Sequence, residues 1–158
     1  MTDPTRVKAD LIPFRDEYTR DVLSWLDSEE TLWAVCRSKE FPPSEDLVRG
    51  WQRKGVASFI LMSANRPVAY AELWNRPLET AMEITHLVVA PNKRDMGYGT
   101  KMLQLLYDRA AQRSDIAKVL LSLYDENEAA LGCYLKAGFE LAGMTKHITG
   151  FRMVRMVR

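Results

Sequence analysis

The chain has 158 residues, the size of one domain, and its 22 lysine and arginine residues nearly balance its 21 aspartate and glutamate residues. This balance gives no electrostatic reason to expect nucleic acid or an anionic membrane as a partner. No apolar run approaches the roughly 18 residues of a membrane span, and the first residues lack the features of a secretion signal. We therefore expect a single cytoplasmic domain over residues 1–158, with no nucleic-acid or membrane partner.

The cysteines and histidines give no sign of a metal or disulfide site. Cys36 and Cys133 are far apart and neither belongs to a C-x-x-C pair, while His86 and His147 are scattered. We expect both cysteines to be small buried hydrophobic residues and the protein to hold no metal.

The first half of the chain predicts a strand, two helices and a hairpin. Two apolar runs separated by residues 63–66 have the spacing of a β-hairpin, and Ser44, directly after two prolines, is a good helix N-cap. The predicted elements are a strand over 7–14, a helix over 16–26, a short helix over 44–53 in the otherwise irregular segment 27–55, and strands over 56–62 and 67–74.

The second half predicts alternating strands and helices. In the strand over Ala81–Val89, alternation separates two largely apolar sets of side chains, Glu83, Thr85, Leu87 and Val89 on one side and Met82, Ile84, His86 and Val88 on the other. A strand apolar on both faces suits the centre of a sheet covered by helices above and below. A helix is expected over 99–113, a strand over 118–124, a helix after Asn127, and strands over 139–144 and 147–157. The sequence thus predicts an α/β fold around a mixed sheet.

The segment from Leu87 to Leu103 predicts a phosphate-binding loop. It runs from an apolar strand through Gly97 and Gly99 into a helix. Because glycines lack Cβ, the backbone can approach a ligand closely, and the helix N-terminus adds its positive dipole end. The residue order excludes a Walker loop, and Met102 stands where a dinucleotide fingerprint needs a small residue. A tight turn with glycines present only for packing is the alternative.

A second motif lies between Asn127 and Phe139. Asn127 is a good helix N-cap, and Gly138 is a good left-handed residue to end the helix. Helical spacing puts four residues on one face: Ala130, Cys133, Tyr134 and Ala137. Considered alone, Tyr134 is better explained as a half-buried aromatic residue with a solvated hydroxyl group.

Together the two segments resemble the GNAT superfamily of acetyl-CoA-dependent N-acyltransferases. The pattern Val89-x-Pro91-x-x-Arg94-x-x-Gly97-x-Gly99 resembles the family's pyrophosphate motif, R/Q-x-x-G-x-G/A. The pattern N-x-x-A-x-x-x-Y from Asn127, followed by Gly-Phe, resembles its later motif. The predicted element order is also similar to the whole GNAT fold, which implies a mostly antiparallel mixed sheet with splayed middle strands.

The resemblance implies acetyl-CoA as cosubstrate. Its pyrophosphate is expected over the loop residues Arg94, Asp95, Met96, Gly97, Tyr98, Gly99 and Thr100. The pantetheine arm is expected to pair with the backbone of Leu87, Val88 and Val89, opposite residues 120–123. The amide of Leu87 or Val88 would then stabilise the oxyanion. The resemblance also gives Asn127 a contact with the pantetheine or the adenosine side, and Tyr134 the protonation of the departing thiolate.

Glu83 is the leading candidate for the general base, because it matches the register at which several family members carry a glutamate. It lies about 13 Å along the strand from Leu87, so proton transfer would go through water. The alternative is a partly buried carboxylate paired with a neighbouring arginine or lysine. Glu72 and His86 are the other candidates for the base. In an ideal strand His86 points to the opposite face from Glu83, although a bulge would change that parity.

The expected acceptor is a primary amine of a small molecule, a peptide N-terminus or a lysine, bound by residues 18–55. This segment holds four large aromatic residues and three acids that could attract an amine: Trp25, Trp33, Phe41, Trp51, Asp27, Glu29 and Glu30. The alternative is that the aromatic residues are core and the acids solvated surface. A non-catalytic acyl-CoA-binding regulatory module is the alternative function, and a homodimer is compatible with either.

Overall fold

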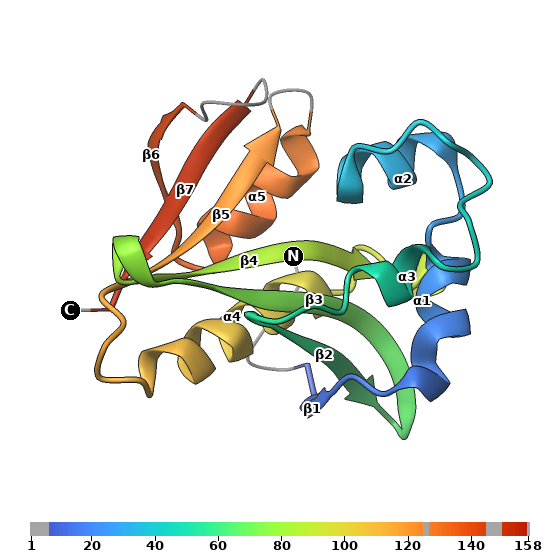
Figure 1. Ribbon diagram of the computed structural model, residues 1–158, viewed down its shortest axis with the longest axis horizontal. Coiled ribbons are helices and arrows are strands. Elements are labelled where there is room, and N and C mark those ends of the chain that lie inside the picture. Colours follow the sequence, from blue (N-terminus) through green and yellow to red (C-terminus); the bar gives the residue numbers. More distant parts are fainter. Residues whose placement is uncertain (1–6, 125–126, 145–149, 158) are drawn as a thin grey trace.

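A computed structural model describes residues 7–124, 127–144 and 150–157. Seven strands form one sheet in the order β1-β2-β3-β4-β5-β7-β6 (Figure 1). Neighbouring strands are antiparallel except for the central pair, β4 and β5, which is parallel. The strands are β1 (Asp10–Pro13), β2 (Val56–Ser63), β3 (Arg66–Arg76), β4 (Ala81–Val89), β5 (Lys118–Tyr124), β6 (Glu140–Met144) and β7 (Gly150–Met156). The predicted mixed, mostly antiparallel sheet is confirmed.

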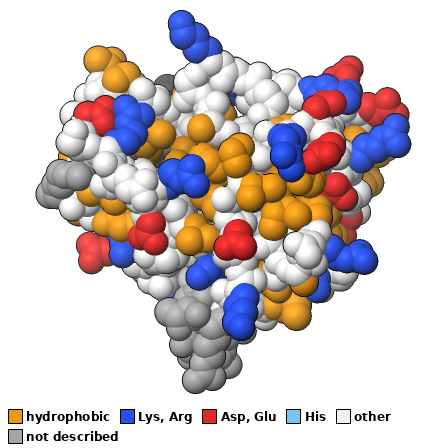
Figure 2. Space-filling view, turned by 90° about the horizontal axis from the view of Figure 1, so that it is seen from below, with side chains coloured by type: hydrophobic (Ala, Val, Ile, Leu, Met, Phe, Trp, Pro, Cys, Tyr) orange, Lys and Arg blue, Asp and Glu red, His pale blue; other side chains and the backbone are white. Residues whose placement is uncertain are grey.

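In the described part of the chain, five α-helices cover the two faces of the sheet: α1 (Thr19–Trp25), α2 (Glu29–Cys36), α3 (Leu47–Gly50), α4 (Tyr98–Ala111) and α5 (Glu128–Lys136). One core cluster joins residues of α1, α2 and α3 to Ile60, Tyr70 and Val88. The other joins α4 and α5 to the opposite face, including Leu61 and Ile84. On the face shown in Figure 2, basic side chains lie among acidic ones, as their nearly equal numbers predict.

The predicted parting of the middle strands is present. β4 and β5 pair over four residues, from Ala81 with Lys118 to Ile84 with Leu121. Beyond that point the two strands separate, and α2 lies across the opening from α5 (Figure 1). A gap in the middle of the sheet leaves backbone groups of β4 without a strand partner on this side.

A β-bulge at His86 corrects the predicted alternation of β4. The register with β3 shifts between the pairs Glu72–Thr85 and Tyr70–Val88, and His86 has a φ of 52°. Ile84 therefore packs on the α4 side together with Leu87 and Val89, while Val88 packs on the side of α1. The prediction for the strand beyond Thr85 was wrong because the extra residue of a bulge exchanges the two faces.

Several boundaries differ from the prediction for local reasons. The segment taken as irregular contains α2, which begins because the Ser28 hydroxyl accepts the Thr31 amide at 3.0 Å. The helix predicted over 44–53 is only the single turn of α3, and the first strand is shorter than expected. His147 lies outside the described residues. No helix in the described part of the chain is long and apolar enough to cross a membrane.

The β2–β3 hairpin and the two caps of α5 agree with the predictions from the sequence. Ala64 and Asn65 both have positive φ at the tip of the β2–β3 hairpin, as a tight turn of matching twist requires. The Asn127 side chain accepts the Ala130 amide at 3.1 Å, and Gly138 has a φ of 90° just after α5. The predicted caps are confirmed.

Replacing Gly150 with alanine is expected to destabilise the protein by about 2 kcal/mol, because of overpacking against backbone. A Cβ at Gly150 would overlap the Leu123 carbonyl oxygen on β5, an atom that cannot move without breaking the sheet. Gly50→Ala is the control, since nothing lies within 4 Å of its added Cβ. Urea unfolding of both variants measures the difference, and equal midpoints would contradict the close approach of β5 and β7.

Candidate functional site

A cleft of about 750 Å³ opens where β4 and β5 part. Ten of the twelve residues predicted to bind the cosubstrate line it: Leu87, Val88, Val89, Arg94, Asp95, Gly97, Gly99, Thr100, Asn127 and Tyr134. The other two point elsewhere. The Tyr98 hydroxyl lies 3.1 Å from Ser63 Oγ, and Met96 is about half exposed, at 47%.

The glycine loop leaves the first amides of α4 open. Gly97 is the N-cap of this 14-residue helix with a φ of 94°, a conformation that favours glycine, and no side chain caps the helix there. The amides of Tyr98, Gly99 and Thr100 precede the first intrahelical bond, which Lys101 donates to Gly97. A row of unpaired amides at a positive dipole end suits a phosphate.

Gly99 also brings three elements together. A Cβ there would lie 3.4 Å from Cys133 Sγ on α5 and 3.7 Å from Val89 Cγ2 on β4. Thr100 Oγ1 lies 3.3 Å from the same sulfur atom. The close approach of α4 to α5 therefore depends on a small residue at Gly99, so packing and ligand access both favour glycine.

The Arg94 guanidinium is bonded to protein atoms, although the sequence predicted that it would add charge at the pyrophosphate. Its Nε donates to the Val89 carbonyl at 3.1 Å and its Nη2 to the Trp25 carbonyl at 2.9 Å. Asp27, predicted to attract an amine, forms an ion pair with Arg94 at 3.4 Å. Arg94 thus fastens the loop to the end of α1.

Sequence reasoning missed several residues of the cleft. Lys93 lines it, and the Lys93 side chain forms no ion pair or hydrogen bond with another described residue. The remaining missed residues come from α2 and α5: Thr31, Ala34, Val35, Ala129, Ala130, Gly132, Cys133 and Lys136. Helical periodicity after Asn127 marks the α5 residues, whereas the α2 residues could be found only by recognising Ser28 as an N-cap.

Tyr134 stands where the cleft meets a second cavity of about 300 Å³. Burial, together with Cys133 and Tyr124 nearby, raises the pKa of the Tyr134 hydroxyl well above its usual value. The group therefore keeps its proton at neutral pH. A protonated hydroxyl at the junction of two cavities can donate to an anion formed there.

Two of the three candidates for the general base line the second cavity, and the third is hydrogen-bonded to one of them. Glu83 and His86 line it together with Thr85 and Tyr124, and Glu72 lies behind them. Burial raises the pKa of Glu83, while Arg76, at 3.7 Å, opposes that shift. Glu83 is therefore a partly buried carboxylate paired with an arginine, as the alternative reading expected, and its role as the general base stays a prediction.

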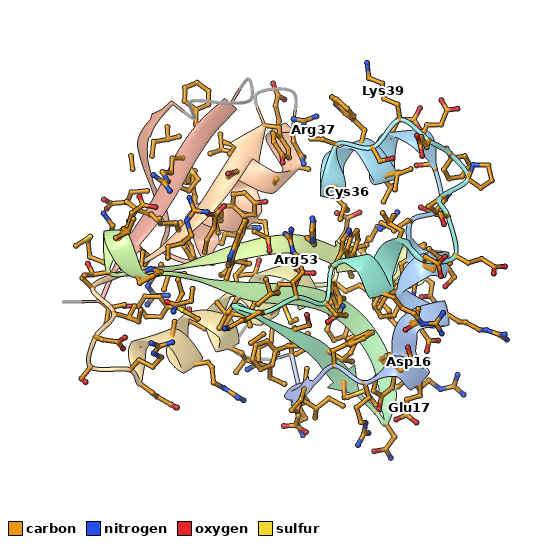
Figure 3. The ribbon with its side chains drawn as sticks, viewed as in Figure 1. Asp16, Glu17, Cys36, Arg37, Lys39 and Arg53 are labelled. Carbon is orange, nitrogen blue, oxygen red and sulfur yellow. The ribbon has the colours of Figure 1, made fainter. Side chains whose placement is uncertain are left out.

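The end of α2 forms the opposite wall of the second cavity. Cys36 and Arg37 lie there, facing β5 (Figure 3). The Arg37 guanidinium lies 3.3 Å from the centre of the Tyr124 ring, which ties α2 to the end of β5. Trp25 and Trp51 belong to the core, as the alternative reading of the aromatic residues predicted.

The two cysteines are free and partly buried, and burial raises the pKa of each thiol. Among the described residues, no group of three or more histidine, cysteine or acidic side chains could hold a metal ion.

The chain matches a known protein family and resembles several solved structures. The family model described as the acetyltransferase (GNAT) family matches residues 19–139. Among solved structures, the aminoglycoside acetyltransferase AAC(6')-Ib with coenzyme A and kanamycin is 20% identical, with a TM-score of 0.78, over 94% of this chain and 95% of that one. Spermidine N-acetyltransferase from Vibrio cholerae, with coenzyme A and spermine, is 15% identical with a TM-score of 0.78 over 94% and 95%.

The ribosomal-protein-S18-alanine N-acetyltransferase from Escherichia coli is 19% identical, with a TM-score of 0.69, over 95% of this chain and 94% of that one. At these identities the likeness to the three structures concerns the fold.

Replacing Arg94 with alanine is expected to lower both stability and coenzyme A affinity. The change removes two bonds to carbonyl groups, so the free energy of unfolding should fall by about 1–2 kcal/mol while the loop loses its anchor. Lys93→Ala removes a cation from the same cleft without those bonds, and should weaken binding by less than about 1 kcal/mol at unchanged stability. Thermal unfolding without ligand and calorimetric titration separate the two. Equal stability of both variants would contradict the anchoring role.

Proposed function

The chain belongs to the GNAT family of acetyltransferases, with acetyl-CoA as cosubstrate, and from this premise we propose that it acetylates a primary amine bound in the second cavity. The observation that carries the proposal is the junction of the two cavities. They share Ala34, Val35, Leu87 and Tyr134, so a donor in the first and an acceptor in the second would meet there.

The acyl donor would lie along the open side of β4. Its pyrophosphate would bind the amides at the start of α4, with Lys93 adding positive charge nearby. Its pantetheine arm would pair with the backbone of Leu87–Val89, which has no strand partner on this side. The amide of Leu87 or Val88 would then stabilise the oxyanion that forms on the thioester carbonyl.

The transfer would proceed by direct attack in a ternary complex. The amine lone pair forms a C–N bond with the carbonyl carbon, and the C–S bond breaks as the tetrahedral intermediate collapses. The departing thiolate takes a proton from the Tyr134 hydroxyl, whose raised pKa keeps it protonated until that moment. The proton of the amine goes to a group in the second cavity. Glu83, expected from the sequence, lies there and would also attract an ammonium group.

The class of acceptor is supported by the similar structures. The names of these proteins concern an aminoglycoside, spermidine and an alanine residue of a ribosomal protein, all of which present an amine. The second cavity, at about 300 Å³, accommodates an amine-bearing end of a molecule rather than a whole large substrate. Two sequence expectations also belong to the proposal, a cytoplasmic location and a homodimer, and size-exclusion chromatography with light scattering tests the latter.

A thiol-release assay tests the proposed function. Acetyl-CoA is supplied with spermine, kanamycin and a peptide that begins with alanine, and coenzyme A binding is measured in parallel by calorimetry. We expect binding, and amine-dependent thiol release with at least one acceptor class. Binding without release for any amine would favour the non-catalytic acyl-CoA-binding module, whereas failure to bind would remove both functions.

Replacing Tyr134 with phenylalanine is expected to lower kcat by about 10- to 1,000-fold, because the thiolate loses its proton donor. Affinity for acetyl-CoA should change little, since the ring remains. Tyr107→Phe is the matched control. Its hydroxyl donates to the Met156 carbonyl on the outer side of α4, away from both cavities. Steady-state kinetics and calorimetry of the two variants measure the effect, and a wild-type kcat for Tyr134→Phe would assign the proton to another donor.

A further inference from the structure

The imidazole of His86 and the carboxylate of Glu72 form a pair beside the second cavity. His86 Nδ1 lies 2.9 Å from Glu72 Oε1. The Glu72 side chain is almost completely buried, at 2% exposed, whereas the His86 side chain is 20% exposed and lines the cavity. The carboxylate is therefore inside the protein, and the imidazole lies between it and the space that would hold the amine.

The surroundings of Glu72 fix the proton on one nitrogen of His86. The Tyr70 hydroxyl donates to Glu72 Oε2, and Thr85 Oγ1 donates to Oε1 at 2.8 Å. A carboxylate that accepts from all its neighbours requires a donor at Nδ1, so His86 Nδ1 carries a proton. The lone pair of the neutral ring is then on Nε2. Trp51 stacks on the imidazole, with ring centroids 4.1 Å apart and an angle of 21° between the ring planes, and this contact restrains the orientation of the imidazole.

The backbone at His86 is strained to produce this arrangement. His86 has a φ of 52°, in the left-handed region, which costs a non-glycine residue on the order of 1–3 kcal/mol. The bulge lets Thr85 and His86, adjacent in sequence, both bond the same carboxylate across the strand pair. In a regular strand the two side chains would point to opposite faces. The strained backbone conformation thus places the imidazole on the same face of the sheet as Glu72 and the second cavity.

We infer that His86, oriented by Glu72, is the general base that removes the proton from the attacking amine. The inference rests on the proposed function. As the nitrogen of the amine bonds to the carbonyl carbon, His86 Nε2 takes one proton from it, and the carboxylate of Glu72 stabilises the imidazolium through Nδ1. The thiolate takes its proton from Tyr134, and solvent returns the imidazolium proton to the tyrosine. His86 is a catalytic residue in this scheme, and Glu72 is a positioning residue.

Glu83 is the competing candidate for the general base, and its surroundings differ from those of His86. Its carboxylate forms an ion pair with Arg76, which also pairs with Glu79, and Glu79 pairs in turn with Arg152. This network places an arginine beside Glu83. Burial nevertheless raises the pKa of Glu83, so this carboxylate could also accept a proton, and the pH profiles of the variants below distinguish the two groups.

Several titratable groups surround His86 and enter any pH dependence. They come from β3, β4, β5, α5 and the end of α2, and they are Glu72, Tyr70, Glu83, Tyr124, Tyr134, Cys36 and Arg37. Burial raises the pKa of Tyr70, Tyr124, Tyr134 and Cys36, which keeps these groups protonated across the neutral range.

The test is the pH dependence of kcat/KM for His86→Asn, Glu72→Gln and Glu83→Gln, with the best amine from the thiol-release assay. Asparagine tolerates the left-handed conformation and can donate to Glu72, so the fold is retained. We expect His86→Asn to lower kcat/KM by at least about 100-fold and to remove the fall of kcat/KM at low pH, the acidic limb of the pH profile. Glu72→Gln should move that limb to lower pH, because the imidazolium loses its partner charge, while Glu83→Gln should leave it in place.

Gln52→Met is the structural control. Gln52 Nε2 donates to the Tyr70 hydroxyl at 3.0 Å, and that hydroxyl donates to Glu72, so Gln52 belongs to the network without a hydrogen bond to Glu72 or His86. Its loss destabilises the network without touching the Glu72–His86 contact, so the acidic limb should stay in place. The inference would be overturned by a limb that persists in His86→Asn and disappears in Glu83→Gln, or by a limb that moves equally in Gln52→Met and Glu72→Gln.

A second measurement needs no acceptor. The chain has two histidines, so nitrogen NMR of ¹⁵N-histidine-labelled protein gives two rings, and His147→Gln assigns them. We expect His86 as the Nδ1–H tautomer in the wild type. The opposite tautomer would exclude Nε2 as the proton acceptor. If no amine is acetylated although the tautomer is as expected, the proposed function is refuted and the catalytic role with it, while the buried pair itself stands.

Discussion

The site depends on the early end of the pairing between β4 and β5. Four residue pairs join the strands, after which the backbone of β4 runs through the middle of the protein without a strand partner on one side. Unpaired backbone groups inside a protein are costly unless something satisfies them. The cleft between the strands is where a ligand with its own amide groups can do so. The same parting lets residues of α2 and α5 line one space from opposite sides.

The bulge at His86 is the second consequence of this local arrangement. It lies just beyond the end of the pairing between β4 and β5. There β4 has a strand partner only in β3, so an extra residue disturbs only that pairing. It exchanges the faces of the following residues. Leu87 and Val89 then join the core under α4, while the ring of His86 enters the polar network of Glu72, Tyr70 and Gln52.

Arg94 connects the loop to the elements that cover the acceptor side. Its bonds reach the last residue of α1, and α2, which begins four residues later at Glu29, lines both cavities. Helix α2 is held at its other end by the contact of Arg37 with Tyr124. The glycine loop and the α2 wall of the second cavity are therefore parts of one connected arrangement, so a change in the loop is expected to reach the second cavity through the end of α1.

The sequence by itself determined the features that arise within a few residues. The alternation of β4 up to Thr85, the open amides at Gly97, the caps at Asn127 and Gly138, and the mixed sheet follow from local conformational preferences and periodicity. Helix α2 was missed although Ser28 marked its start, because one capping residue in an irregular segment is a weak signal.

Only the tertiary structure decided the partners of the buried polar groups. Arg94 bonds a carbonyl 69 positions away in the chain, and Glu72 meets His86 across two strands. Such contacts depend on strand register, and a bulge of one residue reverses which side chains face each other. The assignment of His86 to the opposite face from Glu83 failed for this reason. Local patterns carry no information on where a strand will slip by one residue.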